Sequence, residues 1–379
     1  MLKDRPIPVF TVGTVDGRDW EMFSGIRSVA FDRSDNLYLL DGQNRRVVVF
    51  DANGKFVRQF GRKGGGPGEL QAPLAMDIAS DGSVVVSDLG NRAFIVFRPD
   101  GEYVRNIPFD EELGFPMNMA ADARAGIIVR ATARVRPDQP VVDHFSPIYR
   151  QPLAGTAAAQ PLYRVPTPAP RVMQSTGTGP ARRVSMSMDP VFGPRPTFGA
   201  LPAGVALHHE SAYAVRILDA AGRHVRTLTR DFKPRKVTKK DQEEWLEQRR
   251  NDAANGTGPT VVMMRATPAG RSASVGTGGQ APSGMAMSLD NVEFAEFMSV
   301  VTSIRTDPQS RIWVQRRGAD GKAAGPIDLM MPDGRYIGTL PPQELPGAVS
   351  ASSLAAWVVT DAELGVERVV VRRLPASWQ

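Results

Sequence analysis

The chain has 379 residues, 42% of them hydrophobic, with 36 Gly, 31 Pro and no Cys. The absence of Cys excludes disulfides, thiolate metal sites and a lipid-bearing cysteine within this chain. The formal net charge is +6, but no dense Lys/Arg run marks a nucleic-acid tract, and no stretch approaches the roughly 18 uninterrupted apolar residues that a membrane span requires.

The amino-terminal segment holds one short strand before the main pattern begins. Residues 1–8 lack the apolar segment of a secretory signal, so the protein is either cytoplasmic or has had a signal removed. Residues 9–12 (Val-Phe-Thr-Val) form an orphan strand. We expect this strand to pair with the carboxyl-terminal repeat, because that pairing closes a ring of sheets and covers exposed strand edges.

A sequence segment that occurs twice, 47 residues apart, follows this strand. Residues 36–54 and 83–101 align without a gap, and each copy has two apolar strands, a turn of the form Asp-x-x-Asn-Arg and a closing Gly. Asp41 and Asp88 begin the two turns. A repeat of this length built from short strands predicts a toroid of β-sheets, a β-propeller.

Weaker copies of the repeat continue to the end of the chain. They predict an all-β fold, a six-bladed propeller of four-stranded antiparallel blades, in one domain that spans residues 1–379. The expected blades lie at about 26–70, 73–109, 116–166, 197–232, 297–342 and 345–378, and residues 9–12 complete the last one. Insertions are expected at 166–196 and 233–296.

These residues resemble bacterial six-bladed β-propellers with NHL-type repeats, whose blades carry Asp-x-x-Asn-Arg-x-x-x-Phe-x-x-x-Gly. Residues 41–54 and 88–101 fit this pattern, and residues 61–70 resemble the Gly-Pro-Gly-Glu turn that joins the first two blades in that family. The resemblance implies a fold and not a reaction, since family members serve as binding modules, lyases or lactonases. It also favours a periplasmic or extracellular location if a signal has been removed.

Later blades depart from the family pattern. His209 stands where Asp41 does, and Tyr213 stands where Arg45 does. The role of the repeated Asp and Arg is therefore not performed six times.

The second insertion contains one helix signal and one low-complexity stretch. Thr238 to Asp241 predict a cap for a short surface helix over residues 242–252, whose only large apolar residues are Trp245 and Leu246. Residues 253–289 are rich in Gly, Ala, Ser, Thr and Met. We expect them to form a disordered strap, with a lid over one face of the ring as the alternative.

Most catalytic patterns are missing. Gly64 to Gly68 resemble a phosphate cradle but lack a following Lys-Ser/Thr and a helix, which favours a turn. The cluster His208-His209-Glu210 is the one dense group of metal-ligand types. Adjacent strand residues point to opposite faces, so at most His208 and Glu210 share one. We therefore expect no metal, no cofactor and no catalytic residue.

The Asp-x-x-Asn-Arg turn has two possible roles. In the structural one, Asp41 and Asp88 accept backbone N–H bonds while Arg45 and Arg92 lie within reach of their charge. In the functional one, these groups rim one mouth of the central channel and hold an anionic or polar ligand. The full set of candidate binding residues is Asp41, Arg45, Asp88, Arg92, Arg130, His208, His209, Glu210, Arg316 and Asp361.

The leading hypothesis is a non-catalytic, monomeric scaffold that binds a protein partner or a small ligand through one face of the ring. A metal-dependent lyase or lactone hydrolase with its site at the central channel is the alternative. RNA or other polyanion binding through the arginines is a second alternative, although a nucleic-acid partner is not expected. Peripheral membrane association stays open.

Overall fold

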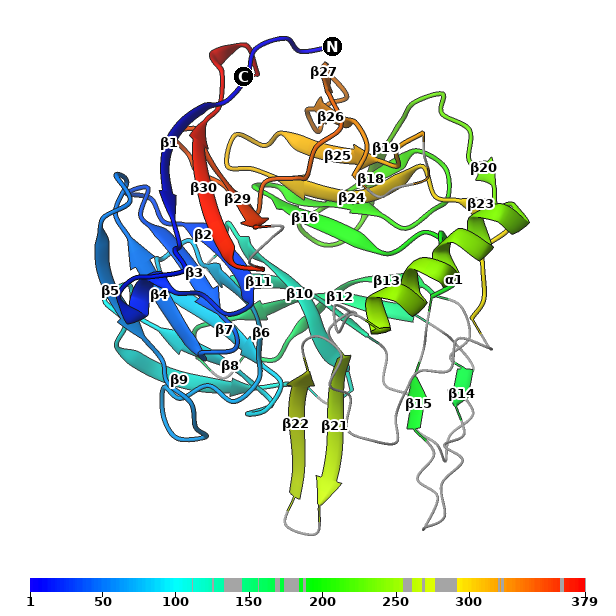
Figure 1. Ribbon diagram of the computed structural model, residues 1–379. Helices are drawn as coiled ribbons and strands as arrows, with labels where there is room; N and C mark the ends of the chain where they lie inside the picture. The colour runs from blue at the N-terminus through cyan, green and yellow to red at the C-terminus, as the bar shows by residue number, and fades with distance from the viewer. Residues whose placement is uncertain are drawn as a thin grey trace.

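The structure is a computed structural model (Figure 1). It describes residues 1–110, 112–124, 126–132, 145–155, 157–167, 171–173, 184–186, 189–254, 261–267, 270–276, 292–319, 321, 324–361 and 365–378. Within these residues, no helix is long and apolar enough to cross a membrane.

Six four-stranded antiparallel sheets, all within the described residues, form the blades of a propeller (Figure 1). The first three blades consist of β2 (Ile26–Phe31), β3 (Leu37–Asp41), β4 (Arg46–Phe50) and β5 (Phe56–Phe60); β6 (Pro73–Ile78), β7 (Val84–Asp88), β8 (Ala93–Phe97) and β9 (Tyr103–Pro108); and β10 (Phe115–Asp122), β11 (Gly126–Thr132), β12 (Phe145–Pro152) and β13 (Gln160–Pro166).

The other three blades follow the same order from the innermost strand outwards. They consist of β16 (Thr197–Leu201), β17 (Gly204–His208), β18 (Ala214–Asp219) and β19 (His224–Thr229); β24 (Val301–Thr306), β25 (Ile312–Arg316), β26 (Ile327–Met330) and β27 (Tyr336–Leu340); and β28 (Ala348–Val349), β29 (Leu354–Thr360), β30 (Glu367–Arg373) and β1 (Ile7–Val12). The predicted six-bladed, all-β fold is confirmed.

The amino-terminal strand completes the last blade, as expected. Strand β1 pairs antiparallel with β30, so that Ile7 lies opposite Arg373 and Val12 lies opposite Val369. Val12 is buried in the core between the last blade and the first. The pairing covers the edge of β30 that would otherwise be exposed.

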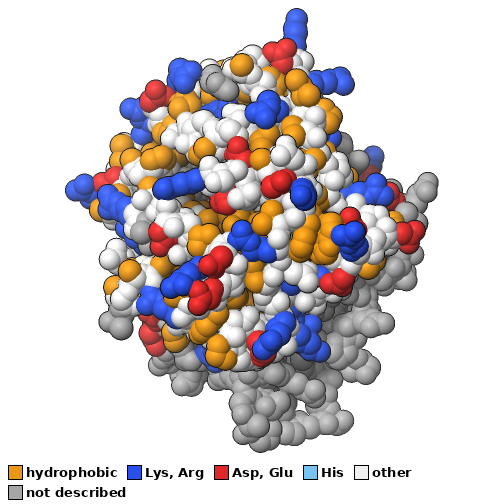
Figure 2. All heavy atoms as spheres, turned by 90° about the vertical axis from the view of Figure 1, so that its left-hand side faces the viewer, with side chains coloured by type: hydrophobic (Ala, Val, Ile, Leu, Met, Phe, Trp, Pro, Cys, Tyr) orange, Lys and Arg blue, Asp and Glu red, His pale blue; other side chains and the backbone are white. Residues whose placement is uncertain are grey.

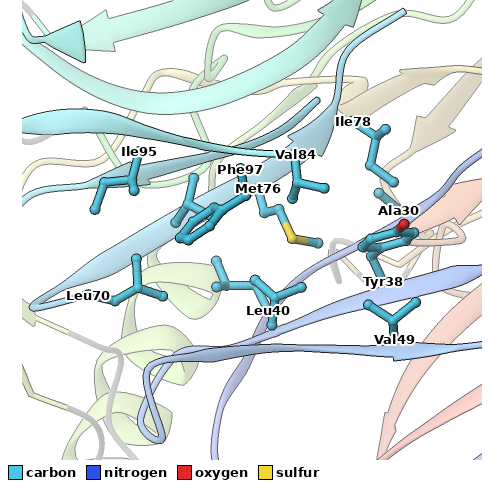
Figure 3. Packing of buried hydrophobic residues seen from close by; sticks show 12 residues of the cluster. Ala30, Tyr38, Leu40, Val49, Leu70, Met76, Ile78, Val84, Ile95 and Phe97 are labelled. Carbon is cyan, nitrogen blue, oxygen red and sulfur yellow. The ribbon is translucent and has the colours of Figure 1, made fainter. Parts of the chain in front are cut away.

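Apolar side chains gather between neighbouring blades. In the described residues, each of the six interfaces between adjacent blades holds one buried cluster. Between the first two blades, Tyr38 and Leu40 of β3 pack with Met76 and Phe97 of the second blade (Figure 3). The middle strands therefore bury both faces, which explains why they read as continuous apolar runs.

Side chains of the innermost strands also join one blade to the next. The Met76 N–H donates to Ser28 Oγ of the first blade (3.0 Å), and the Ala121 N–H donates to Asp77 Oδ2 of the second (2.8 Å). Between the fourth and fifth blades, the Ile304 N–H donates to Thr197 Oγ1 (3.2 Å). These bonds satisfy backbone groups that have no further strand to pair with.

Antiparallel order sends alternate connections to opposite faces of the ring. Connections from the second to the third strand of a blade, and from the fourth strand to the next blade, leave the same face, which we call the insertion face. Connections from first to second and from third to fourth strand leave the other face, the turn face. The two chain termini lie close together in Figure 1 and, by the same order, on the turn-face side.

Short turns built on aspartate form the turn face. In the connection from β2 to β3, Asp32 Oδ1 accepts the N–H groups of Ser34 (2.8 Å) and Asn36 (2.9 Å). Similar bonds to the residues that follow are made by Asp51, Asp81, Asp100, Asp219, Asp307 and Asp333. A carboxylate that accepts backbone N–H groups two and four residues on fixes the turn.

Long connections leave only the insertion face in the described chain. Residues 167–196 include the strand pair β14 (Arg171–Met173) and β15 (Val184–Met186). Residues 230–300 include helix α1 (Lys239–Ala254), the pair β20 (Arg235–Lys236) and β23 (Phe297–Met298), and the hairpin β21 (Val261–Thr267) and β22 (Gly270–Gly276). In Figure 1, β14, β15, β21 and β22 project on the side opposite the termini.

The sequence did not predict these three strand pairs. The expected strap or lid over residues 253–289 contains the β21–β22 hairpin, and the remainder of that range beyond residue 254 lies outside the described residues. Two short 3-10 helices, Asp19–Glu21 and Ala376–Trp378, complete the described elements.

Helix α1 begins with the predicted cap. The Thr238 N–H donates to Asp241 Oδ2 (2.8 Å), and the Asp241 N–H donates back to Thr238 Oγ1 (3.3 Å). The helix is longer than the predicted range of 242–252. Trp245 packs edge-on against Phe294, with 5.7 Å between ring centroids, and so anchors the helix to its own connection.

Removal of residues 1–16 is expected to lower the melting temperature by several degrees, because it exposes the edge of β30 and removes Val12 from a core. Thermal unfolding followed by circular dichroism measures the change. Val9→Thr, at a position with 40% exposure, keeps the strand and serves as the control. A truncated protein that melts with the full chain would contradict closure by β1.

Candidate binding face

All ten predicted binding residues lie on the insertion face. Each stands near the end of the second strand of a blade or in the connection that follows it, and the set is Asp41, Arg45, Asp88, Arg92, Arg130, His208, His209, Glu210, Arg316 and Asp361. They are spread over all six blades, with two in the first, two in the second, three in the fourth and one in each of the others. The structure therefore brings them to one face, where they are distributed around the ring.

Asp41 is a fully buried acceptor at the first turn. Its carboxylate accepts the Ser24 N–H (3.1 Å), the Asn44 side-chain amide (2.8 Å) and the Nε and Nη2 groups of Arg46 (3.2 Å each). The sequence placed Arg45 within reach of this charge, but Arg46 makes the ion pair. Charge-assisted bonds of this kind are the stronger ones in proteins.

Arg45 instead turns away from Asp41, because its backbone is in the left-handed region (φ 56°). Its Nε donates to the carbonyl of Gln71 (2.8 Å), which joins the first turn to the connection before the second blade. Arg92 has the same backbone conformation (φ 53°). A positive φ is uncommon outside glycine, so the repeated arginine marks a backbone position as well as a charge.

Asp88 repeats the carboxylate of Asp41 with different partners. It accepts the N–H groups of Gln71 (2.7 Å), Ala72 (3.1 Å) and Asn91 (2.9 Å). Ala93 lies opposite Asp88, where the first blade has Arg46 opposite Asp41, so no ion pair equivalent to that of Arg46 forms at this position among the described residues. Both carboxylates thus accept backbone N–H groups, and Asp41 in addition pairs with the guanidinium of Arg46.

His208 and Glu210 do not converge. The fully buried His208 imidazole donates from Nδ1 to the Ala214 carbonyl (2.8 Å), and burial lowers the pKa of His208. Glu210 pairs with Arg216, whose hydrogen bond lowers the pKa of Glu210. Burial also lowers the pKa of His209. Since Glu210 is committed to a guanidinium, the pair does not fit a divalent cation.

No three His, Cys, Asp or Glu side chains gather closely enough to hold a metal ion in the part of the chain that the structure describes.

Arg316 belongs to a charged cluster between the fourth and fifth blades. Its Nε donates to Asp328 Oδ2 (3.1 Å), and Arg230 Nη1 lies 2.7 Å from Asp328 Oδ1. The Thr339 hydroxyl also donates to this fully buried carboxylate (2.5 Å). Burial beside Asp328 raises the pKa of Tyr213. The cluster satisfies one buried charge with two guanidinium groups.

Two further predicted residues have local partners. Arg130 donates from Nη2 to Asn118 Oδ1 (2.5 Å) on the innermost strand of its own blade, and burial lowers its pKa. Asp361 lies 3.8 Å from Arg368 across the β29–β30 connection.

Sequence reasoning missed a pair of charges on the axis of the ring. Asp77 of β6 and Arg305 of β24 come from opposite blades, the second and the fifth. Burial raises the pKa of Asp77 and lowers the pKa of Arg305, and each charge partly offsets the effect of burial on the other. Arg305 Nη1 donates to the Gly347 carbonyl of the sixth blade (2.8 Å). A single charged residue within each of these two innermost strands was the signal available for this pair.

Sequence reasoning also missed three arginines at the base of the long connections: Arg195, Arg235 and Arg317. They stand far apart in the sequence and share no local pattern, so only the folded structure brings them together.

Comparisons with known proteins fit this architecture. Residues 18–122 match the model of a family described as a 6-bladed beta-propeller. A segment of 89 residues, 24% of the chain, is 33% identical to human E3 ubiquitin-protein ligase NHLRC1 and spans 22% of that protein. A 48-residue segment, 13% of the chain, is 50% identical to RING finger protein nhl-1 of Caenorhabditis elegans and spans 5% of it.

A solved structure of a member of the DUF4221 family from Bacteroides vulgatus covers 97% of each chain, with a TM-score of 0.52 and 10% sequence identity. At that identity the likeness shows the fold alone. Together with the matches to NHL-repeat proteins, it confirms a six-bladed propeller whose first blades resemble NHL-type repeats.

Arg46→Gln is expected to lower the free energy of unfolding by about 3–5 kcal/mol, because it leaves the buried Asp41 carboxylate without its cation. Arg45→Gln is expected to cost about 1 kcal/mol, since it weakens hydrogen bonds of a partly exposed side chain to carbonyl oxygens. Urea unfolding measures both. Equal losses for the two variants would contradict the assignment of Arg46 as the partner of Asp41.

The lowered pKa of His208 predicts acid sensitivity. The unfolded chain binds a proton near pH 6.5 and the folded one only at lower pH, so this contribution to stability is complete above pH 6.5 and is lost as the pH falls towards the folded pKa. The free energy of unfolding should drop more between about pH 7.5 and 5.5 in the wild type than in His208→Gln, in which His209 remains. Identical pH dependence in the two proteins would count against a buried neutral imidazole.

Proposed function

We propose that the protein is a non-catalytic binding module that holds a protein partner or a small ligand on its insertion face. The support is the contrast between the two faces of the ring. On the turn face, every connection in the described chain has seven residues or fewer, and aspartates fix many of them. On the insertion face, residues 167–196 and 230–300 add a helix and three strand pairs.

This contrast points to binding because loops on a rigid scaffold are free to vary and carry most recognition. The six cores between blades hold the scaffold together, and among the described residues of the two long connections only Phe232 and Val300 pack against one of these cores. The additional elements therefore serve something other than the fold. All ten candidate residues stand on the same face as those elements.

The lateral surface beside the first two blades offers no comparable feature (Figure 2). Beside the first two blades, Lys and Arg are interspersed with Asp and Glu, and hydrophobic side chains are scattered among them (Figure 2). A surface of mixed sign without a large apolar patch is typical of solvent-exposed protein surface. The insertion face is the better candidate for a specific contact.

The two residues expected to serve a metal-dependent enzyme, His208 and Glu210, do not support that alternative. Glu210 is paired with Arg216, and His208 is buried with Nδ1 bonded to a backbone carbonyl. Neither group is placed to activate a water molecule or hold a reacting oxygen. Binding therefore remains the function that the geometry favours.

The test compares two matched double variants on an affinity support loaded with a native extract. Arg45→Gln/Arg92→Gln changes the insertion face, and Arg33→Gln/Arg98→Gln changes the turn face. We expect at least one retained protein or small molecule to be lost about tenfold with the first variant and kept with the second, a difference of about 1.4 kcal/mol in binding. Melting temperatures within a few degrees of the wild type establish that both variants fold.

Equal retention by the two variants, or a loss confined to the turn-face variant, would contradict the proposal.

A further inference from the structure

Three connections of the insertion face meet at one place between the fourth and fifth blades. The Ser299 N–H donates to the Phe192 carbonyl (2.8 Å), and the Arg317 N–H donates to the Val300 carbonyl (2.8 Å). Val191 and Phe294 form a bridge between the same segments. Backbone bonds thus join the connection before the fourth blade, the connection after it, and the β25–β26 connection of the fifth blade.

Each of these connections contributes one arginine. Arg195 comes from the first, Arg235 from the second and Arg317 from the third. Arg317 Nη1 donates to the Gly321 carbonyl (3.1 Å), and Arg235 Nη2 lies 3.3 Å from the position that a Cβ on Gly321 would take. The guanidinium groups of Arg235 and Arg317 therefore both approach Gly321.

The positive charges outnumber the negative ones. Asp241 accepts both terminal nitrogens of Arg235 (2.9 and 2.8 Å). Within the described residues, the Arg317 guanidinium donates hydrogen bonds only to carbonyl oxygens, those of Ser299 (3.1 Å) and Gly321. The exposed Arg195 has no hydrogen bond or ion pair in the described part of the chain, and Glu296 on the second connection pairs with none of the three.

The electrostatics of Arg317 agree with this crowding. Burial lowers the pKa of Arg317, and the positive charges of Arg195 and Arg235 lower it further. Guanidinium groups that are held close together favour the binding of an anion, because the anion offsets the repulsion between their positive charges.

An aromatic residue with an unusual backbone supports Arg317. The guanidinium carbon of Arg317 lies 5.6 Å from the centroid of the Phe192 ring, and Phe192 has φ 66°. A bulky residue in the left-handed region carries a free-energy cost of about 1–3 kcal/mol, and such residues cluster at ligand sites. Phe192 also contacts Phe294, at 6.0 Å between centroids, which fixes its ring beside the arginine.

We propose that Arg195, Arg235 and Arg317 form an anion site on the insertion face that takes a phosphate group. Asp241 neutralises Arg235, while Arg195 and Arg317 have no carboxylate partner in the described residues, so two positive charges remain, which matches a phosphate dianion. Arginine suits this ligand because its planar donor fork binds two phosphate oxygens at once. The site names a ligand chemistry for the insertion face and so rests on the proposed function.

The two arginines with backbone or carboxylate partners also hold the connections together. Arg235 ties Asp241, at the start of α1, to the β20 segment, and Arg317 joins the two loops that flank it. Arg195 has no such role in the described residues, so its substitution leaves the fold intact. It is therefore the decisive position for a test.

The experiment is calorimetric titration of the purified full chain with inorganic phosphate at constant ionic strength. We expect saturable binding by the wild type, weaker by about tenfold in Arg195→Gln and unchanged in Arg33→Gln, a turn-face control. Phosphate should also raise the melting temperature of the wild type more than that of Arg195→Gln. Arg317→Gln should weaken binding at least as much. If Arg317→Gln fails to fold, Arg195→Gln still tests the site.

Absence of saturable binding by the wild type would overturn the site. Equal affinity in Arg195→Gln would overturn it as well. An equal rise in melting temperature for both proteins, without heat of binding, reports exclusion of phosphate from the protein surface and also contradicts it.

The result is separable from the test of the proposed function, because it uses purified protein and different residues. If phosphate does not bind but Arg45→Gln/Arg92→Gln still loses its partner, only the phosphate site falls. If phosphate binds as expected but no partner is lost from either double variant, the site stands and the wider proposal of partner binding falls.

Discussion

The even number of strands in each blade is the constraint on which the rest of the structure depends. Four antiparallel strands start and finish a blade on the same face, so every connection to a new blade leaves that face. Strand β1 keeps this rule at the chain ends, since it supplies the fourth strand of the last blade and returns the chain to the insertion face before β2. A propeller built in this way can lengthen its connections on one face while the other keeps tight turns.

Packing between blades supplies the stability that allows the connections on one face to lengthen. Each blade shares one apolar core with each neighbour, and side chains such as Ser28 and Asp77 hold the innermost strands together. Among the described residues of 167–196 and 230–300, only Phe232 and Val300 pack against one of these cores. The long connections instead pack on each other, through Trp245, Phe294 and Phe192, and hold arginines close together above the junction of two blades.

The sequence predicted the parts of the fold that recur within a short window. Two strands and two turns that repeat after 47 residues were enough for the propeller, and the orphan strand at residues 9–12 was enough for the closure. The ion pair of Asp41 was assigned to Arg45 because spacing alone does not reveal that a left-handed backbone turns Arg45 away and leaves Arg46 beside the carboxylate. The convergence of Arg195, Arg235 and Arg317 was beyond sequence reasoning, since long-range folding places them and no periodic pattern marks them. The strands β21 and β22 lie in a Gly- and Ser-rich stretch whose composition favoured disorder.

The central claim is that recognition belongs to the insertion face, and the arginines offer a direct probe because both faces carry them. Phenylglyoxal modification, read by mass spectrometry, is compared between the purified protein and the same protein in its native extract. Protection in the extract should concentrate on insertion-face residues such as Arg45, Arg195 and Arg317, while the turn-face residues Arg33, Arg98 and Arg335 react equally in both. Protection of the turn-face arginines with full reactivity on the insertion face would contradict the claim.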